Sequence, residues 1–335
     1  MLWAEPSGAY TRIPGSPLTG PMRRSARLRF GHLSHNGRMN AVVWKSEAGR
    51  ARLEEWYTRF ASRIPVPVAS HEVATRHGKG HVLIGGPEGA PTIVCLHAMR
   101  TGAAHLLSEF GPLMERFRLV APDQPGQSVR GPQVKLPLTD LAYADWLRDV
   151  LDALHLQRPH LVGVSWGGFV ARQFASASPD RVHSLSLLVP AGIVNGSTWR
   201  GLTRMAWPMV RYRLSPTDEH ARQLLDPLVT TPDEHWIRFM ADSMQDMVFD
   251  MRIPPLASDD DLRRLTMPTL VLGGDDDISF PGEPMVARMR ALVPGVDAEV
   301  VRGCKHCPPT TETFRRWFAQ RIGDHVAAAP ARGTA

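Results

Sequence analysis

Cysteine is scarce in this chain of 335 residues, which contains only Cys95, Cys304 and Cys307. Three thiols cannot form the disulfide framework of a small secreted domain, and a chain of this length can bury a large core without one. No run approaches the ~18 apolar residues of a membrane helix, and no apolar run follows Arg23-Arg24 near the start. These absences predict a soluble, cytoplasmic protein that does not span a membrane.

Acidic residues are almost absent from the first 40 positions, where six arginines accompany only Glu5. The chain has a net charge of +6, of which this segment carries +5, so only +1 remains for everything after it. Because a nucleic-acid partner needs positive charge on the folded part, we expect no nucleic-acid binding. Residues 1–38 mix Pro, Gly, Ser, Thr and Arg without periodicity, which predicts a disordered leader.

Short β-branched runs alternate with helical patterns after residue 65, which is typical of an α/β fold with a mostly parallel sheet and helices on both faces. We predict eight strands, with the first two forming a hairpin at the sheet edge, at 71–75, 81–85, 92–96, 118–121, 160–164, 182–188, 269–272 and 299–302. Apolar residues at helical spacing predict helices at 46–64, 103–116, 141–154, 166–177, 283–292 and 311–322.

The stretch 191–262 interrupts this alternation, because it lacks a strand-like run and has Trp, Met and Arg at helical spacing. We interpret it as a helical cap inserted after the sixth strand, which leaves 39–190 and 263–325 as the core and 326–335 as a flexible tail. Its large apolar residues either pack the cap on the core or form a wall over the site. They are Trp199, Met205, Trp207, Met209, Trp236, Phe239, Met240, Met244, Met247 and Phe249.

Residues 160–168 read HLVGVSWGG, a buried-strand pattern that passes through G-x-S-x-G into a helix pattern. A serine on such a tight turn projects its hydroxyl from the sheet, and small residues two positions to either side allow the turn. The helix that begins there also points backbone N–H groups toward developing negative charge. These features make Ser165 the candidate nucleophile.

A serine hydroxyl is a weak nucleophile, so it needs a base within hydrogen-bond reach and a third group that fixes the tautomer of the base. In this order of the triad, both partners follow the serine in sequence. The strand pattern before residue 275 ends in three aspartates at 275–277, and the next strand pattern ends in His306. The one other histidine beyond residue 277 is His325, near the C-terminus.

Together these motifs make residues 65–322 resemble the α/β-hydrolase fold family, and the layout is most similar to small bacterial serine carboxylesterases. In that family the acid is the third residue after the glycine of a strand–G-x-x-D pattern, which implies Asp277 and leaves Asp275 and Asp276 as turn residues. His306 matches the Gly-His pair of the family, with Lys305 where glycine is usual.

The resemblance also implies the two backbone donors of an oxyanion hole. One is the N–H of Trp166, and the other is the N–H of Met99, in a loop where Ala98 replaces the usual glycine. His97 is expected to pack this loop. Asp123, in the turn after the fourth strand, is expected to bind backbone N–H groups at the floor of the site.

Cys304 and Cys307 flank His306 in a C-x-x-C pattern. One such pair supplies two of the four ligands of a structural zinc site, so we expect neither a metal nor a cofactor. The sequence leaves open whether these two thiols form a reversible disulfide.

Three functions remain in competition. The first is hydrolysis of a small hydrophobic carboxylic ester, or of a thioester, lactone or amide, through an acyl-enzyme on Ser165. The second uses the same residues for C–C bond hydrolysis or acyl transfer. The third is a ligand-binding receptor with a hydrolase fold and little turnover. A serine at residue 165 argues against dehalogenase and epoxide hydrolase relatives, which resemble this fold but carry aspartate there.

Overall fold

The computed structural model describes residues 43–248 and 252–329. The predicted leader at 1–38 lies outside the described residues, as does Phe249. Among the described residues, no helix is long and apolar enough to cross a bilayer.

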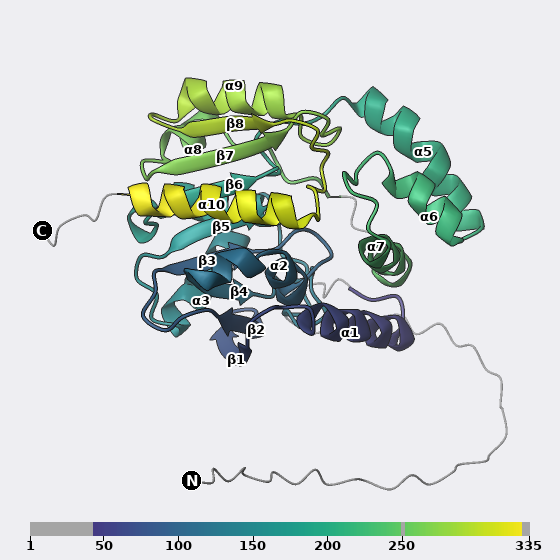
Figure 1. Ribbon diagram of the computed structural model, residues 1–335, viewed down its shortest axis with the longest axis horizontal. Coiled ribbons are helices and arrows are strands. Elements are labelled where there is room, and N and C mark those ends of the chain that lie inside the picture. The colour runs from purple at the N-terminus through teal and green to yellow at the C-terminus, as the bar shows by residue number, and fades with distance from the viewer. Residues whose placement is uncertain (1–42, 249–251, 330–335) are drawn as a thin grey trace, which may run out of the picture. The chain divides into compact units, whose positions relative to one another are not determined.

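The centre of the fold is one eight-stranded sheet with the order β1-β2-β4-β3-β5-β6-β7-β8 (Figure 1). Its strands are β1 Val68–Thr75, β2 Gly78–Gly85, β3 Thr92–Leu96, β4 Arg118–Pro122, β5 His160–Val164, β6 Leu185–Leu188, β7 Thr269–Gly274 and β8 Asp297–Val301. Strands β3 to β8 pair in parallel, whereas β1 pairs antiparallel with β2, and β2 antiparallel with β4. The predicted eight-stranded, mostly parallel sheet with an edge hairpin is confirmed.

Two buried apolar clusters lie on the two faces of this sheet, because successive strand residues point to opposite sides. Leu161 of β5, for example, belongs to one cluster and Val162 to the other. The first cluster is covered by α3 Ala142–Ala153, α4 Trp166–Ala177, α8 Asp259–Arg263 and α9 Gly282–Leu292. The second is covered by α1 Glu47–Ala61, α2 Ala103–Glu109 and α10 Glu312–Ala328.

Several predicted boundaries are wrong, each for a local reason. The predicted helix 103–116 ends as α2 at Glu109 and continues as the 3-10 helix η1 Gly111–Glu115, because Pro112 has no N–H to continue the α-helical ladder. The sixth strand begins at Leu185 instead of 182, because residues 182–184 form an irregular connection between the short 3-10 turn η2 Pro179–Arg181 and the strand.

The last helix is longer than predicted. α10 runs to Ala328, past the expected end at 322 and into the predicted tail. Phe318, Ile322 and Val326 recur every four residues and are buried, so one face of the helix remains packed on the core beyond the expected end.

Between β6 and β7 the chain forms α5 Thr198–Leu214, α6 Asp218–Leu225, α7 Glu234–Asp246 and α8. α5, α6 and α7 gather at one end of the sheet (Figure 1), and we call these three helices the cap. α8 packs on α4 and α9 instead, and Leu262 lies in the cluster of the core. The core therefore resumes at α8, ahead of the expected cap boundary at 262.

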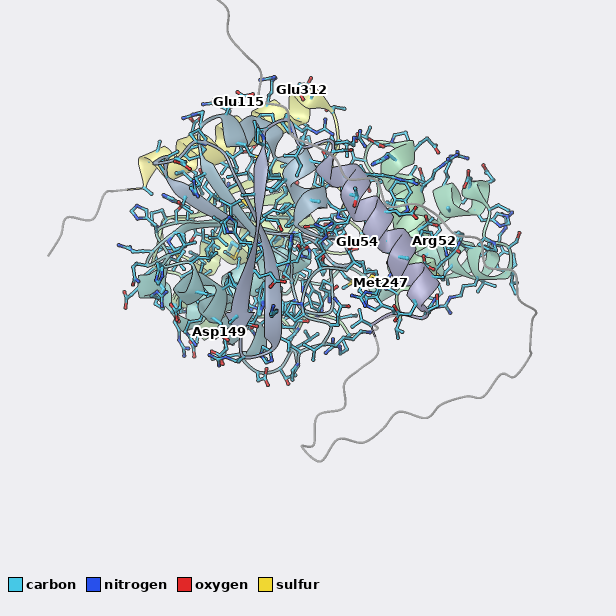
Figure 2. The ribbon with its side chains drawn as sticks, turned by 90° about the horizontal axis from the view of Figure 1, so that it is seen from below. Arg52, Glu54, Glu115, Asp149, Met247 and Glu312 are labelled. Atoms are coloured by element: carbon cyan, nitrogen blue, oxygen red, sulfur yellow. The ribbon has the colours of Figure 1, made fainter. Side chains whose placement is uncertain are left out.

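Helix α1 connects the cap to the core. Its N-terminus is capped by the Ser46 hydroxyl, which accepts from the N–H of Gly49. Figure 2 shows Arg52 and Glu54 along α1, with Met247, the residue that follows α7, nearby. The Arg52 guanidinium binds Asp246 at 2.8 Å, and the Trp56 indole donates to Asp242 at 2.7 Å. These bonds hold α7 in place.

Candidate active site

Ser165 lies on the turn between β5 and α4, with backbone angles of φ 51° and ψ −110°. A positive φ is strained for a residue with a side chain, so the surrounding structure must hold it. Three backbone hydrogen bonds do so. The Ser165 N–H donates to the Leu188 carbonyl at 3.0 Å, and the Ser165 carbonyl accepts from the N–H groups of Phe169 at 3.1 Å and Ala191 at 3.0 Å.

Glycines at 163 and 167 permit this turn by their lack of a side chain. A Cβ atom on Gly167 would lie 2.0 Å from the Leu96 carbonyl oxygen, and one on Gly163 would lie 2.5 Å from the carbonyl oxygen of Gly167. Neither contact is sterically possible without a shift of the backbone. The sequence pattern G-x-S-x-G therefore reflects the close packing of β5, α4 and β3.

A chain of hydrogen bonds joins the three residues that the sequence singled out. The Ser165 Oγ lies 3.0 Å from His306 Nε2, and His306 Nδ1 lies 2.9 Å from Asp277 Oδ2. With the ring proton on Nδ1 donated to the carboxylate, Nε2 is left to accept the serine proton. Ser165 after β5 is thus brought together with Asp277 after β7 and His306 after β8, which follow it by 112 and 141 positions in the chain.

Asp277 is the one of the three adjacent aspartates that binds His306. Its Oδ1 accepts from the N–H groups of Ser279 at 2.7 Å and Phe280 at 3.0 Å. Burial alone would raise the pKa of Asp277, but the charge and hydrogen bond of His306 and these two N–H groups hold the pKa below its usual value. The carboxylate is therefore ionised and fixed in orientation.

The other two aspartates have different surroundings. Asp275 accepts from the Cys304 N–H at 3.0 Å and so fastens the end of β7 to the loop after β8. Asp276 is half exposed and lies 4.0 Å from Arg204. Both fit the turn positions implied by the sequence.

The loop that carries His306 is fastened by the segment between α6 and α7, a feature that the sequence analysis missed. The Thr230 hydroxyl accepts from the Lys305 N–H at 2.9 Å and donates to the Cys307 carbonyl at 2.7 Å. The Cys307 N–H donates to the Leu228 carbonyl at 2.7 Å. The cap thus holds the residues on both sides of His306.

Lys305, which stands where the family has glycine, also reaches the cap. Its Nζ donates to the Asp226 carbonyl at 2.7 Å. The departure from the family pattern therefore adds a bond between the histidine loop and α6.

Cys304 and Cys307 are both free thiols. Cys304 Sγ donates to the Lys305 carbonyl at 3.3 Å, and burial raises the pKa of both thiols to about 12. Thiols with so high a pKa are almost entirely protonated near neutral pH and are weak nucleophiles. Within the described part of the chain, no three His, Cys, Asp or Glu residues are grouped as metal ligands.

The two expected oxyanion donors lie in the same cavity as Ser165. Trp166 is the first residue of α4, so its N–H has no acceptor within the helix. Met99 lies in the loop after β3, which His97 anchors: His97 Nε2 accepts from the Gln124 N–H at 2.9 Å, and the Gln124 side chain donates to the His97 carbonyl at 2.6 Å. Burial lowers the pKa of His97, which keeps the ring neutral and able to accept.

Asp123 binds a backbone N–H group, as the sequence led us to expect. Its Oδ1 accepts from the Ala103 N–H at 2.8 Å, at the start of α2, and from the Ser128 hydroxyl at 2.5 Å. Its Oδ2 accepts from the Tyr57 hydroxyl at 2.8 Å. A side chain on Gly102 would collide with this carboxylate, since a Cβ atom there would lie 2.7 Å from Oδ1.

Asp123 also ends a second Ser-His-Asp chain. His81 Nδ1 lies 2.7 Å from Asp123 Oδ2, and Ser70 Oγ lies 2.7 Å from His81 Nε2. Ser70 is an exposed residue in the middle of edge strand β1, whereas Ser165 precedes a helix N-terminus. This second chain offers a matched control for experiments on Ser165.

Comparison with known proteins decides the family. The model of the alpha/beta hydrolase family matches residues 93–320, about two thirds of the chain. The chain belongs to the alpha/beta hydrolase family. It resembles an uncharacterized carboxylesterase, nap, of Bacillus subtilis, at 25% identity over 289 residues that cover 81% of this chain and 94% of the relative.

Two further comparisons place this α/β hydrolase among its relatives. A 2-hydroxy-6-oxononadienedioate/2-hydroxy-6-oxononatrienedioate hydrolase of Cupriavidus pinatubonensis is 28% identical over 244 residues, 65% of this chain and 81% of that protein. The crystal structure of naproxen esterase from Bacillus subtilis shares the fold, with a TM-score of 0.69, 23% identity and coverage of 84% of this chain and 99% of that one.

A cavity of about 580 Å³ opens over Ser165 in this α/β hydrolase. Its volume is in the range of small-molecule sites, and its lining is mostly apolar. Six of the ten cap residues that the sequence suggested as an apolar wall line it, namely Met205, Met209, Trp236, Phe239, Met240 and Met244.

The other three described residues of that set lie elsewhere. Trp199 and Trp207 are 71% and 67% exposed on α5, and Met247 is buried in the core cluster around α1. Helical spacing could not distinguish the inward-facing from the outward-facing positions of α5, because this helix carries apolar residues on both its inner and its outer side.

One charged pair lines this apolar cavity. Glu109 Oε2 accepts from Arg315 Nε at 2.8 Å, and Glu109 Oε1 accepts from the Trp236 indole at 2.8 Å. The pair joins α2 and α10 of the core to α7 of the cap. Because each charge meets the other, the pair adds no net charge to the cavity.

Proposed function

We propose that this α/β hydrolase cleaves carboxylic esters of small hydrophobic substrates through an acyl-enzyme on Ser165. The observation that carries the proposal is the hydrogen-bonded chain Ser165–His306–Asp277 opening into an apolar cavity. The carboxylesterase relatives support the same class of substrate.

In the first step the ester carbonyl enters the cavity beside Ser165. The hydroxyl attacks the carbonyl carbon while His306 Nε2 takes its proton, and Asp277 stabilises the imidazolium that forms. The negative charge that develops on the carbonyl oxygen is bound by the N–H groups of Trp166 and Met99, each worth about 3 kcal/mol in such sites.

Collapse of this intermediate breaks the bond between the carbonyl carbon and the alkoxy oxygen. His306 returns the proton to the leaving oxygen, so the alcohol departs neutral and the acyl group stays on Ser165. Water then enters, loses its proton to His306 and attacks the acyl carbon. The free acid is released as the proton passes back to Ser165.

The lining of the cavity favours an apolar acyl or alcohol group. Methionine side chains such as Met205 and Met240 adapt to different shapes, which suits a site that accepts a range of hydrophobic esters.

Hydrolysis of a C–C bond is the second candidate, because the dioate hydrolases are also relatives. A substrate with two carboxylates would need cationic partners. Three arginines line the cavity, of which Arg315 binds Glu109 and Arg252 donates to the Leu136 carbonyl, and most of the remaining lining is apolar. The ester reading is therefore preferred. Turnover of a vinylogous diketone at a rate above that of an apolar ester would reverse this preference.

The test is labelling with a fluorophosphonate together with burst kinetics on a chromogenic ester. We expect one labelled serine, Ser165, and loss of both label and turnover in Ser165→Ala. Ser70→Ala is the matched control, since it removes the serine of the second Ser-His-Asp chain and should retain both. If Ser165→Ala keeps its label or its turnover, or Ser70→Ala loses them, the assignment is wrong.

A further inference from the structure

The outer side of α5 carries an exposed apolar surface that the proposed reaction does not use. Trp199, Trp207, Val210 and Leu214 are 71%, 67%, 45% and 82% exposed, and we call them the cap stripe. At about 100° per residue they fall within about 80° of one another around the helix, so they form a single band. Such a band on a helix requires an explanation, because exposed aromatic residues of this size are rarely grouped by chance.

The charges of α5 suggest what covers the cap stripe. The helix contains four arginines and no acidic residue. Arg204 and Arg211 lie on one side of the stripe, about 40–60° beyond Trp207, and Arg213 lies about 40° beyond Trp199 on the other side. Asp218 of α6 binds Arg238 and Glu219 binds Gln223. Arg204 lies 4.0 Å from the half-exposed Asp276, and Arg211 binds the neutral Gln223 side chain, so both guanidinium groups stay close to the surface beside the stripe. A band of Trp and aliphatic residues between arginines is the pattern of a helix that lies in an anionic lipid interface.

The inner side of the same helix faces the candidate active site. Met205 and Met209 of α5 line the cavity that contains Ser165. One helix therefore separates the outer apolar surface from the apolar cavity. A surface bound to the cap stripe would therefore be separated from the cavity by the width of one helix.

We propose that the cap stripe docks this protein onto a membrane surface that contains anionic phospholipid. The two indole rings and Leu214 enter the interface, and the arginines beside them bind the lipid phosphates. A hydrophobic ester dissolved in the lipid then lies next to the cavity. The docking itself does not depend on the proposed hydrolysis.

The experiment is flotation of the full chain with vesicles of phosphatidylcholine and phosphatidylglycerol, compared with vesicles of phosphatidylcholine alone. We expect the wild type to bind the anionic vesicles and the double variant Trp199→Ser/Trp207→Ser to bind them at least about tenfold more weakly. Leu141→Ser, which removes a half-exposed apolar residue at the start of α3, is the control and should bind like the wild type.

Both comparisons leave the charge of the chain unchanged, so the arginines in residues 1–40 contribute equally to all three proteins. The tryptophans are exposed and lie outside the cavity lining, so the double variant should keep its melting temperature and its turnover of a water-soluble ester. Those two measurements report folding and the proposed hydrolysis separately from docking.

Equal binding of the double variant and the wild type would overturn the proposal, since charge alone would then explain attachment. The proposal would also be overturned if the wild type formed a dimer in solution, the double variant were monomeric, and vesicles did not compete with dimer formation. A second copy of the chain would then cover the stripe.

Discussion

Thr230 is the residue through which the cap fixes the position of His306, and removing its hydroxyl tests this arrangement. Thr230→Val keeps the size and branching of the side chain but removes the acceptor for the Lys305 N–H and the donor to the Cys307 carbonyl. That carbonyl keeps a second donor, the Thr230 N–H at 3.1 Å, so the main loss is the partner of the Lys305 N–H. We expect the free energy of unfolding to fall by about 1–2 kcal/mol.

The effect on catalysis should exceed the effect on stability. His306 must stay within hydrogen-bond distance of the Ser165 hydroxyl, now 3.0 Å away, and a displacement of ~1 Å can cost about a hundredfold in rate. We therefore expect kcat on a chromogenic ester to fall about tenfold to a hundredfold. Since Thr230 does not line the cavity, KM should change little.

The assay is steady-state kinetics and thermal melting of Thr230→Val beside two controls. Thr230→Ser restores the hydroxyl and should recover most of kcat. Thr231→Val removes a neighbouring hydroxyl with no hydrogen bond to the histidine loop and should behave like the wild type. If Thr230→Val melts lower yet retains kcat within about twofold of wild type, the hydroxyl only stabilises the fold and the reasoning is refuted.

Two further predictions concern the acid and a buried histidine. Asp277→Asn should lower kcat by about 10⁴-fold, because it favours the wrong tautomer of His306. Asp275→Asn and Asp276→Asn should lower kcat far less. Steady-state kinetics of the three variants would refute the assignment if Asp277→Asn were the mildest. His105→Phe should remove a loss of stability that the wild type suffers in acid. Burial lowers the pKa of His105 to about 3, so the ring stays neutral in the native state but binds a proton below pH ~6.5 in the unfolded chain. The stability of the wild type therefore falls as the pH falls, and the variant avoids this loss. Neither ring nitrogen has a hydrogen-bond partner. In urea unfolding, the free energy of unfolding of the variant minus that of the wild type should be about 2 kcal/mol larger at pH 5 than at pH 8. An equal difference at both pH values would contradict this account.

The local parts of the site could be read from the sequence because each depends on a short segment. The turn at Ser165 needs glycines within two residues, and both strand ends that carry Asp277 and His306 are marked by apolar runs. The alternation of strand and helix patterns also predicted the parallel sheet, because a helix between two strands carries the chain back so that both strands run in the same direction. The carboxyl ends of such strands meet at one edge of the sheet. The choice among the three aspartates came from family resemblance, and in the structure Asp277 binds His306.

Contacts between segments far apart in sequence were decided only by the tertiary structure. Thr230 and Lys305 are 75 residues apart, and no spacing in the chain indicates that one holds the other. The same holds for the outward direction of Trp199 and Trp207, because a helix with apolar residues on two sides shows which side is inner only once it is packed. Sequence periodicity reports the neighbours of a residue along its own element, whereas the arrangement of the cap over the core depends on packing between elements.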